Sequence, residues 1–426
     1  MAFGGRRRGP GGQPAPMPTG DGMKKALLGT TALLGLSLAV APTFAAEPIK
    51  LVVGGYFKEA YQVVIDDDDE GEIGNERNTD GFFNDAEIHF VGSTVLDNGL
   101  EVGARVELEG ETDDDQIDEA WIWFSGGFGE VRIGSEDEAL ANACIVPPGG
   151  TANFSAFSPN QWGANTDPVS GRLGDFSSNS ICTGVDRQSD AQKIVYISPS
   201  FSGFQLTVSY TPSDSAETHN DGGGPHLGMP EHFLKDGRHN FSAYGTYSYE
   251  GQGWGLTAGF GGSWQGHGEE DSGGFKTNER DFYQTGLNLD VGNFSIGIAG
   301  EFFNDETNDD FGDLGFSELD IWTAGIGAAY RMDAWTFGLQ YSHREDDLDI
   351  SGSVIEDMTF QQDRAVATVN YALGPGISID GEIGYTWIDT DPELENNPGL
   401  GITGGFGDGI DDYDAIEFGV GTSITF

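Results

Sequence analysis

The residues of this sequence that could do chemistry are charged, and many of them gather in one long segment. Residues 136–190 are rich in Gly, Pro, Ser and Asn, and they interrupt a chain that otherwise alternates between polar and apolar residues. A segment of this length without regular structure inside a folded domain is usually functional. All seven of its acids are candidate site residues: Glu136, Asp137, Glu138, Asp167, Asp175, Asp186 and Asp190.

Basic residues on the alternating segments are candidate partners of these acids. Arg105 and Arg132 fall on polar faces and are the best candidates. The simpler alternative for Arg105 is a salt bridge to Glu107 or to an acid of a neighbouring segment, and for any single acid of 136–190 it is contact with bulk solvent. Weaker basic candidates are Lys58, Arg77 and Arg364.

Cys144 and Cys182 are the only cysteines, and both lie within 136–190. An exported chain meets an oxidising compartment, where disulfides persist. We therefore expect the two to pair and to limit the freedom of the segment. Two free thiols are the alternative.

Runs of acidic residues offer oxygen ligands of the kind that Ca²⁺ and Mg²⁺ prefer. Asp66, Asp68, Glu70 and Gly71 resemble the start of an EF-hand loop, but its twelfth position is Arg77. The EF-hand motif therefore fails. Calcium at Asp66, Asp68 and Glu70 stands as an expectation beside the simpler interpretation of solvated acid, and no cofactor is required. Other such runs are 113–115, 308–310 and 345–347.

No catalytic centre is indicated. Among the histidines, only His89 and His343 fall on alternating segments, and neither has a serine partner at the spacing of a hydrolase motif. We therefore expect no enzymatic activity.

The composition excludes other classes of protein. The chain has 20 Lys and Arg against 70 Asp and Glu, a formal net charge of −50. It lacks the basic face that phosphate contacts require, so no nucleic acid is expected as a partner. Disorder accompanies high net charge only where aromatic residues are few, whereas 12% of this chain is aromatic. The abundance of Gly and aromatic residues indicates an all-β protein.

The N-terminal region predicts export. Residues 23–45 combine a basic start at Met23-Lys24-Lys25, an apolar stretch and the small-x-small cleavage pattern Thr43-Phe44-Ala45. This is typical of a secretory signal peptide cleaved near Ala45. Residues 1–22 are interpreted as an extension from a misassigned upstream start, with a twin-arginine signal at Arg6-Arg7 as the alternative.

From Ile49 onward, sixteen segments alternate with period two, and the connections between them are long, then short, then long. A soluble sandwich has no reason to keep every second connection short, whereas a transmembrane barrel has short turns on one side and long loops on the other. The expected strands are 49–65, 83–97, 100–111, 116–125, 129–135, 191–199, 202–212, 240–250, 253–265, 280–291, 293–304, 318–331, 334–345, 360–373, 376–388 and 413–426.

The alternation also predicts which faces meet water. Sixteen strands enclose a cylinder too wide for side chains to fill, so the apolar faces must contact lipid and the polar faces must line water. In hydrocarbon the backbone has no other partners, so the barrel must close. Aromatic residues near strand ends are expected to form girdles at the membrane interfaces: Tyr56, Tyr210, Tyr249, Trp254, Trp264, Trp335, Tyr341, Tyr385 and Trp387.

Acids outnumber bases on the expected inner wall, so a weak preference for cations is predicted. These acids are Glu87, Glu101, Glu107, Glu119, Glu130, Glu301, Asp380, Glu382 and Glu417.

The final strand carries a family resemblance. Ile416, Phe418, Val420, Thr422, Ile424 and Phe426 alternate with small or polar residues, and the chain stops on Phe426. This pattern, after a signal peptide, resembles the C-terminal signature of Gram-negative outer-membrane proteins. Sixteen strands with one outsized loop after the fifth resemble the general diffusion porins, and the run Gly-Phe-Gly-Glu-Val-Arg-Ile-Gly at 127–134 resembles their alphaproteobacterial branch. The resemblance covers essentially all of 46–426.

The resemblance implies a sixteen-stranded antiparallel transmembrane β-barrel, with residues 136–190 folded into the lumen as a constriction loop whose acids face basic side chains of the wall. Opposed charges at a narrow point of a water-filled passage create a transverse field that orients water and dipolar solutes. It also implies passive diffusion of small hydrophilic solutes and ions, a homotrimer, and contact with outer-membrane lipid and lipopolysaccharide, whose phosphates bound Ca²⁺ would bridge. A sugar-specific channel is the main alternative, with Trp121, Trp123 and Tyr196 as an aromatic track, although the run 120–124 does not reveal which face is which. A plugged structural barrel is a third possibility.

Overall fold

The computed structural model of the chain describes residues 48–66, 79–110, 117–157, 181–182, 191–213, 238–266, 280–305, 316–350, 357–390 and 413–426. The expected signal peptide at 23–45 and the extension at 1–22 lie outside these residues. So do Asp68, Glu70, Arg77, Asp167, Asp175, Asp186 and Asp190, and Asp66 is described only as the last residue of a strand.

These residues form sixteen strands in one closed antiparallel barrel, which confirms the predicted fold class. Each strand pairs with its neighbours in sequence, and β1 pairs with β16. The strands are β1 Lys50–Asp66, β2 Asp80–Val95, β3 Glu101–Glu109, β4 Ala120–Gly126, β5 Gly129–Ser135, β6 Gln192–Ile197, β7 Phe204–Ser213, β8 Arg238–Glu250, β9 Trp254–Gly266, β10 Arg280–Val291, β11 Phe294–Asp305, β12 Phe316–Met332, β13 Trp335–Ile350, β14 Asp357–Gly374, β15 Ile377–Thr390 and β16 Tyr413–Thr425.

The first and last strands close the barrel. β1 and β16 pair from Tyr56↔Thr425 to Asp66↔Ala415. At the chain end, Gly55 and Phe426 exchange two backbone hydrogen bonds of 3.1 Å. The alternation that predicted the last strand therefore also supplies the seam of the barrel, where an unpaired edge would otherwise remain.

Two strands extend further into acidic residues than the alternation predicts. β13 continues to Ile350 and β14 begins at Asp357, and Asp346 and Asp347 pair with Phe360 and Thr359 in the ladder. The run 345–347, which the sequence grouped with the acidic loops, is therefore part of β13. Charged residues hid this extension because the backbone ladder continues beyond the apolar band.

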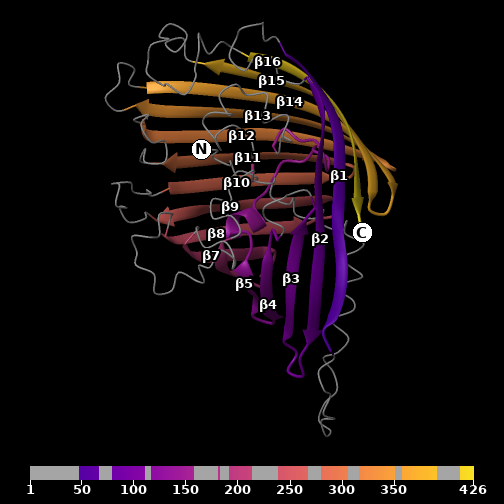
Figure 1. The fold of residues 1–426 in the computed structure, drawn as a ribbon, viewed down its shortest axis with the longest axis vertical. Coiled ribbons are helices and arrows are strands. Elements are labelled where there is room, and N and C mark those ends of the chain that lie inside the picture. The colour runs from indigo at the N-terminus through magenta and orange to yellow at the C-terminus, as the bar shows by residue number, and fades with distance from the viewer. Residues whose placement is uncertain are drawn as a thin grey trace, which may run out of the picture.

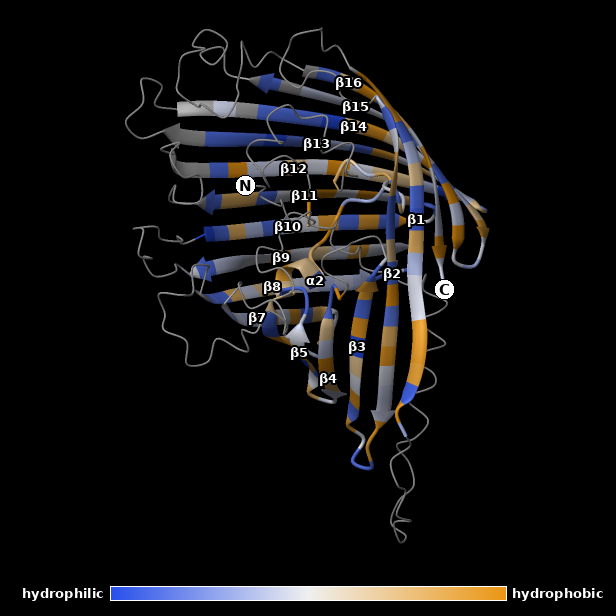
Figure 2. Cartoon of the chain, in the orientation of Figure 1, coloured by the Kyte–Doolittle hydropathy of each residue, from blue (hydrophilic) through white to orange (hydrophobic). Residues whose placement is uncertain are grey.

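Apolar side chains point outward and polar ones inward. Phe260, Leu339 and Ile383 are 65%, 62% and 57% exposed on the outer surface, whereas the inward Gln284 and Gln340 are buried. Figure 2 shows the resulting alternation of hydrophilic and hydrophobic colour along single strands. Tyr56 is an exception to the predicted aromatic girdle, because it faces inward and its hydroxyl donates a 2.5 Å hydrogen bond to Glu87.

A short helix, α2, spans Ala139–Ala143 and follows β5. Among these residues no helix has the length and apolar character needed to cross a membrane. In Figure 1, β1 and β2 pass in front of the right-hand ends of the strands behind them, whereas β3 and β4 lie lower in the view.

Candidate functional site

The first part of the constriction loop is fixed to the inner wall by serine side chains of three strands. The amides of Ala139 and Leu140, at the start of α2, donate to the Oγ atoms of Ser209 in β7 (3.0 Å) and Ser242 in β8 (2.9 Å). Ser263 of β9 donates a 2.6 Å hydrogen bond to the carboxylate of Glu138. Because helix N-termini present amides without internal partners, these serines satisfy groups that burial would otherwise leave unpaired.

The next residues of the loop run across the wall as extended chain. Their carbonyl oxygens accept hydrogen bonds from inward side chains. Gln284 and Asn288 of β10 donate to Ile145 and Val146, both at 2.9 Å. In addition, Gln340 of β13 donates to Pro147 (3.3 Å) and Pro148 (3.4 Å), and Thr368 of β14 donates to Gly149 (2.5 Å). Polar inward residues thus replace water as partners of the loop backbone.

The loop then reaches the far wall and turns back. Asn153 donates a 2.7 Å hydrogen bond to Asp380 of β15, and the ring of Phe154 contacts Phe83 of β2 edge-on with centroids 6.4 Å apart. On the return, Ser155 and Ala156 both donate to Gln340, at 3.0 and 2.9 Å. Residues 136–157 therefore lie inside the barrel, and residues 158–180 and 183–190 lie outside the described chain.

Glycines make room for the loop on the wall beneath it. A methyl group on Gly327 of β12 would overlap the carbonyl oxygen of Pro148, and one on Gly338 of β13 would overlap that of Gly149. The same holds for a series of inward glycines whose added methyl would meet loop atoms at less than 3.0 Å: Gly286, Gly297, Gly325, Gly419 and Gly421. The wall is thus shaped to the path of the loop.

A disulfide joins Cys144, which follows α2, to Cys182 near the other end of the loop. The backbone amide of Cys182 donates a 2.6 Å hydrogen bond to Glu301 of β11. The disulfide and this bond together hold the later part of the loop beside the earlier part.

The three predicted wall bases on β1, β3 and β5 all face the lumen, and each meets an acid. Lys58 lies 2.6 Å from Asp85 and 4.3 Å from the centre of the Tyr56 ring. Arg105 pairs with Glu107, which is the simpler alternative that the sequence left open, and its side chain is 32% exposed. Their charges are therefore partly neutralised within the wall.

Arg132 of β5 joins the wall to the start of the loop. Its guanidinium pairs with Glu130 (2.6 Å) and with Glu136, and it lies over the ring of Trp121 at 4.6 Å. Burial raises the pKa of the Glu136 carboxyl, and the neighbouring guanidinium opposes that rise. Lys193 of β6 donates to the carbonyl of Glu136. Of the predicted loop acids, Glu136 thus lies directly against a predicted base.

The other two predicted loop acids among the described residues, Asp137 and Glu138, have different surroundings. Glu138 is fully buried against the wall, so its carboxylate fixes the loop and does not face an open passage. The backbone amide of Asp137 donates a 3.1 Å hydrogen bond to Glu119, which precedes β4.

The aromatic run in β4 has a defined orientation. Trp121 and Trp123 face inward, where their ring centroids lie 5.3 Å apart, and Ile122 and Phe124 are exposed on the outer face. Tyr196 pairs with Val131 on the outer side of β6 and donates to the carbonyl of Phe128 near a short turn. The inclusion of Tyr196 in an inner aromatic track is therefore wrong, and the two tryptophans remain.

Arg364, a weak candidate from the sequence, is at the centre of a buried charge network. Its guanidinium lies 2.6 Å from Glu417 of β16 and 3.8 Å from Glu382 of β15. Gln62 of β1 donates to Glu382 (2.6 Å) and to Glu417 (3.0 Å), and Thr386 donates to Glu417. One network on the inner side of the barrel thus connects β14, β15 and β16 with β1, across the seam where the barrel closes.

Sequence reasoning missed the inner wall that receives the loop. Taken one at a time, the residues of this wall do not indicate a surface that binds the loop. They are the glycines of β10–β13 and the side-chain amides of Gln284, Asn288 and Gln340. What these positions share is glycine on the inner face of neighbouring strands. An inner wall that met only water would tolerate larger polar residues there. The loop path became visible only when the register placed these residues side by side.

Comparisons with known proteins agree with this architecture. A family model described as "Gram-negative porin" matches residues 29–391. Relatives in sequence include a "Monosaccharide porin" of a Halomonas species and a "Major outer membrane protein" of Halomonas elongata. Each is 24% identical over 196 residues, which cover 44% of this chain and 49% of the relative. The chain thus spans about half the length of the curated relatives it matches.

Solved structures share the barrel. The trimer form of in-vitro folded OmpT of Vibrio cholerae has a TM-score of 0.55 at 13% identity, over 89% of this chain and 100% of that chain. An anion-selective porin from Comamonas acidovorans has a TM-score of 0.53 at 14% identity, over 89% of this chain and 100% of that chain. At these identities the likeness concerns the fold.

Proposed function

Because the chain belongs to the Gram-negative porin family, we propose that it forms a water-filled channel through the outer membrane for passive diffusion of small hydrophilic solutes and ions. The observation that carries this proposal is the constriction loop on the inner wall, held by side chains of β7–β15. A loop held against the inner wall by its own hydrogen bonds narrows the lumen that the inward polar side chains line.

The channel prefers cations weakly. Support comes from the charge pairing of the inner wall, where Lys58, Arg105, Arg132 and Arg364 each lie against a carboxylate. Inner-wall acids outnumber these bases, so the surplus charge is negative. A ring of excess carboxylates favours cations over anions, and a wide pore keeps that preference modest.

The surroundings of the channel follow from the same family. We infer a homotrimer in outer-membrane lipid and lipopolysaccharide, reached by export with cleavage near Ala45. Calcium held by the acidic loops, including Asp66, Asp68 and Glu70, would bridge loops or lipid phosphates. The proposed role is transport without enzymatic chemistry.

A monosaccharide-selective channel is the second candidate. It is favoured by Trp121 and Trp123, which face inward beside Arg132. Aromatic faces pack against the apolar faces of sugars, and a guanidinium donates to hydroxyl groups. The name of the Halomonas relative points to the same substrate class for that protein.

Liposome swelling with sugars of graded size separates the two candidates. For a general diffusion channel, we expect the swelling rate to fall smoothly with solute size and to be equal for stereoisomeric monosaccharides of the same mass. Stereoisomers that enter at different rates, with a difference that Trp121→Ala abolishes, would instead support the sugar channel. Absence of swelling with every solute would contradict both.

A further inference from the structure

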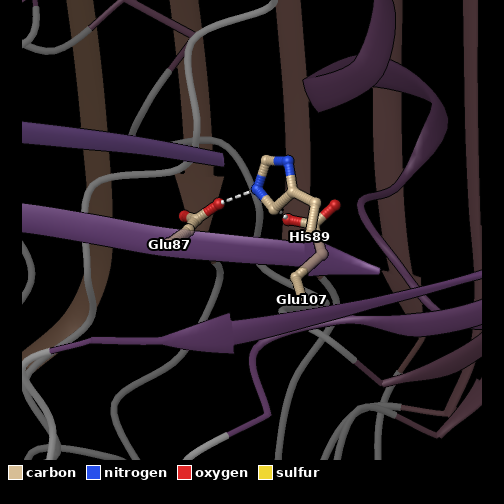
Figure 3. A group of neighbouring side chains, drawn as sticks. All are labelled: Glu87, His89 and Glu107. Carbon is tan, nitrogen blue, oxygen red and sulfur yellow. Dashed lines mark hydrogen bonds and ion pairs between the residues drawn. The ribbon is translucent and has the colours of Figure 1, made fainter. Parts of the chain in front are cut away.

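The inner face of β2 and β3 carries a cluster of three potential metal ligands, Glu87, His89 and Glu107. Glu87 and His89 are two residues apart in β2, and His89 lies opposite Glu107 in the ladder, so all three side chains leave the same face. The Nε2 atom of His89 lies 2.7 Å from Oε2 of Glu87 and 3.4 Å from Oε2 of Glu107. Figure 3 shows the imidazole between the two carboxylates.

These separations are close to those of a tetrahedral metal site. Metal bonds of about 2.0–2.2 Å place neighbouring ligand atoms about 3.4 Å apart. The His89–Glu107 distance already has this value, and one ligand atom from each of the three residues lies within 4.8 Å of the others. Glu87 would have to move by less than about 1 Å, which a side-chain rotation supplies.

The ligand types select the class of metal. One imidazole and two carboxylates with room for a water molecule form a set that Zn²⁺ and related divalent transition ions accept. Ca²⁺ and Mg²⁺ prefer six or more oxygen ligands, which this cluster with its imidazole does not offer.

The electrostatics of the cluster favour a cation. Glu87 and Glu107 are both buried, and Glu109 and Asp118 bring two more carboxylates close to Glu87. Arg105 compensates part of this charge through its pair with Glu107. Burial of like charges is costly unless a counter-charge accompanies them. A bound divalent ion would provide that charge. The hydroxyl of Tyr56, which donates to Glu87, would orient this ligand from outside the metal sphere.

Arg105 would compete with the metal. Its Nη2 atom lies 3.2 Å from Nδ1 of His89, and a guanidinium only donates. Nδ1 therefore accepts, and the ring proton is on Nε2. Metal binding through Nε2 requires that proton to be on Nδ1, so Arg105 must turn away. Its side chain is 32% exposed, which leaves it free to do so.

We propose that Glu87, His89 and Glu107 form a binding site for Zn²⁺ or a related divalent transition-metal ion on the inner wall of the barrel, with Arg105 as the competing cation. Such a site would bind particular metal ions selectively, which differs from the general preference of the channel for cations. Its existence is independent of conduction, because metal binding is measured on the folded chain in detergent.

Cobalt titration tests the proposal, because Co²⁺ occupies zinc sites and gives a visible absorption band when four or five ligands surround it. We expect one equivalent of Co²⁺ to saturate a band that Zn²⁺ abolishes and that Ca²⁺ leaves unchanged. His89→Gln should weaken Co²⁺ binding at least about 100-fold, since loss of even an outer-shell partner costs about 10–100-fold. Arg105→Gln should tighten it.

The matched control is His343→Gln. His343 forms a similar pair with a carboxylate, Asp363 at 2.8 Å, but among the described residues it belongs to no group of three potential metal ligands. This variant should bind Co²⁺ as the unsubstituted chain does. Absence of a saturable band, an unchanged affinity in His89→Gln, displacement by Ca²⁺, or weaker binding in Arg105→Gln would each overturn the proposal. Should His89→Gln fail to fold, Glu107→Gln takes its place, and the spectrum of the unsubstituted chain already decides whether a site exists.

Discussion

Replacement of Arg364 by leucine is expected to lower the free energy of unfolding by about 3–5 kcal/mol, the usual cost of removing one partner from a buried ion pair. Arg364 is 2% exposed and lies 2.6 Å from Glu417 and 3.8 Å from Glu382. Without its guanidinium, two buried carboxylates would lose their cationic partner, and the side-chain donors that the described residues place on them are Gln62 and Thr386. Urea unfolding of the barrel in lipid vesicles measures the change.

A second arginine on the inner side provides the control. Arg331 lies 3.7 Å from Asp290 near a short turn, and the side chains are 52% and 54% exposed. Exposed pairs contribute about 0–1 kcal/mol, so Arg331→Leu should change stability little. If both substitutions changed the free energy of unfolding equally, the network around Arg364 would contribute no more than an exposed surface pair. That result would contradict the stabilising role assigned to this network.

Substitution of Gly327 or Gly338 by alanine is expected to lower single-channel conductance. Their new methyl groups would overlap the carbonyl oxygens of Pro148 and Gly149, and non-bonded contact requires about 3.5 Å. The loop must therefore retreat, and since the wall lies behind it, the only direction open is toward the lumen. The retreat also breaks the hydrogen bonds from Gln340 and Thr368, each a net contribution of about 1 kcal/mol.

Gly255→Ala is the matched control for this prediction. Gly255 lies in β9 at a position whose added methyl meets nothing closer than 3.7 Å. Alanine there should leave conductance unchanged in planar bilayers. If Gly327→Ala and Gly338→Ala conduct like Gly255→Ala, or conduct more than the unsubstituted chain, the loop does not follow the wall along this path.

The sequence predicts the barrel well because its evidence is periodic. Each strand repeats the same alternation, and the short turns mark where it restarts, so errors in single residues do not accumulate. The errors occur where the two faces of a strand do not differ in polarity, so that the alternation cannot be recognised. In 120–124 both faces are apolar, and only the pairing of Arg105 with Trp121 and of Val102 with Phe124 separates them. Where β13 ends and β14 begins, charge conceals a ladder that continues.

The candidate site was less predictable because it depends on contacts between distant parts of the chain. The polar faces indicate an inner-wall position for Arg105 and Arg132, and Glu107 stood among the possible partners of Arg105, but nothing in the sequence pairs Lys58 with Asp85 or Arg132 with Glu136. Arg364 ranked low because a single arginine in β14 gives no sign of Glu417, which lies 53 residues further along the chain. Likewise, nothing along the chain links His89 to Glu107, which lies opposite it in the ladder.

The central claim is that the charged faces of these strands enclose water, with more acid than base along the passage. The most direct test is the reversal potential of the folded chain in a planar bilayer across a KCl gradient. We predict discrete ohmic conductance steps and a reversal potential whose sign indicates K⁺ preference over Cl⁻, reduced at high salt as screening increases. Absence of conductance, or a reversal potential that indicates Cl⁻ preference, would contradict the account.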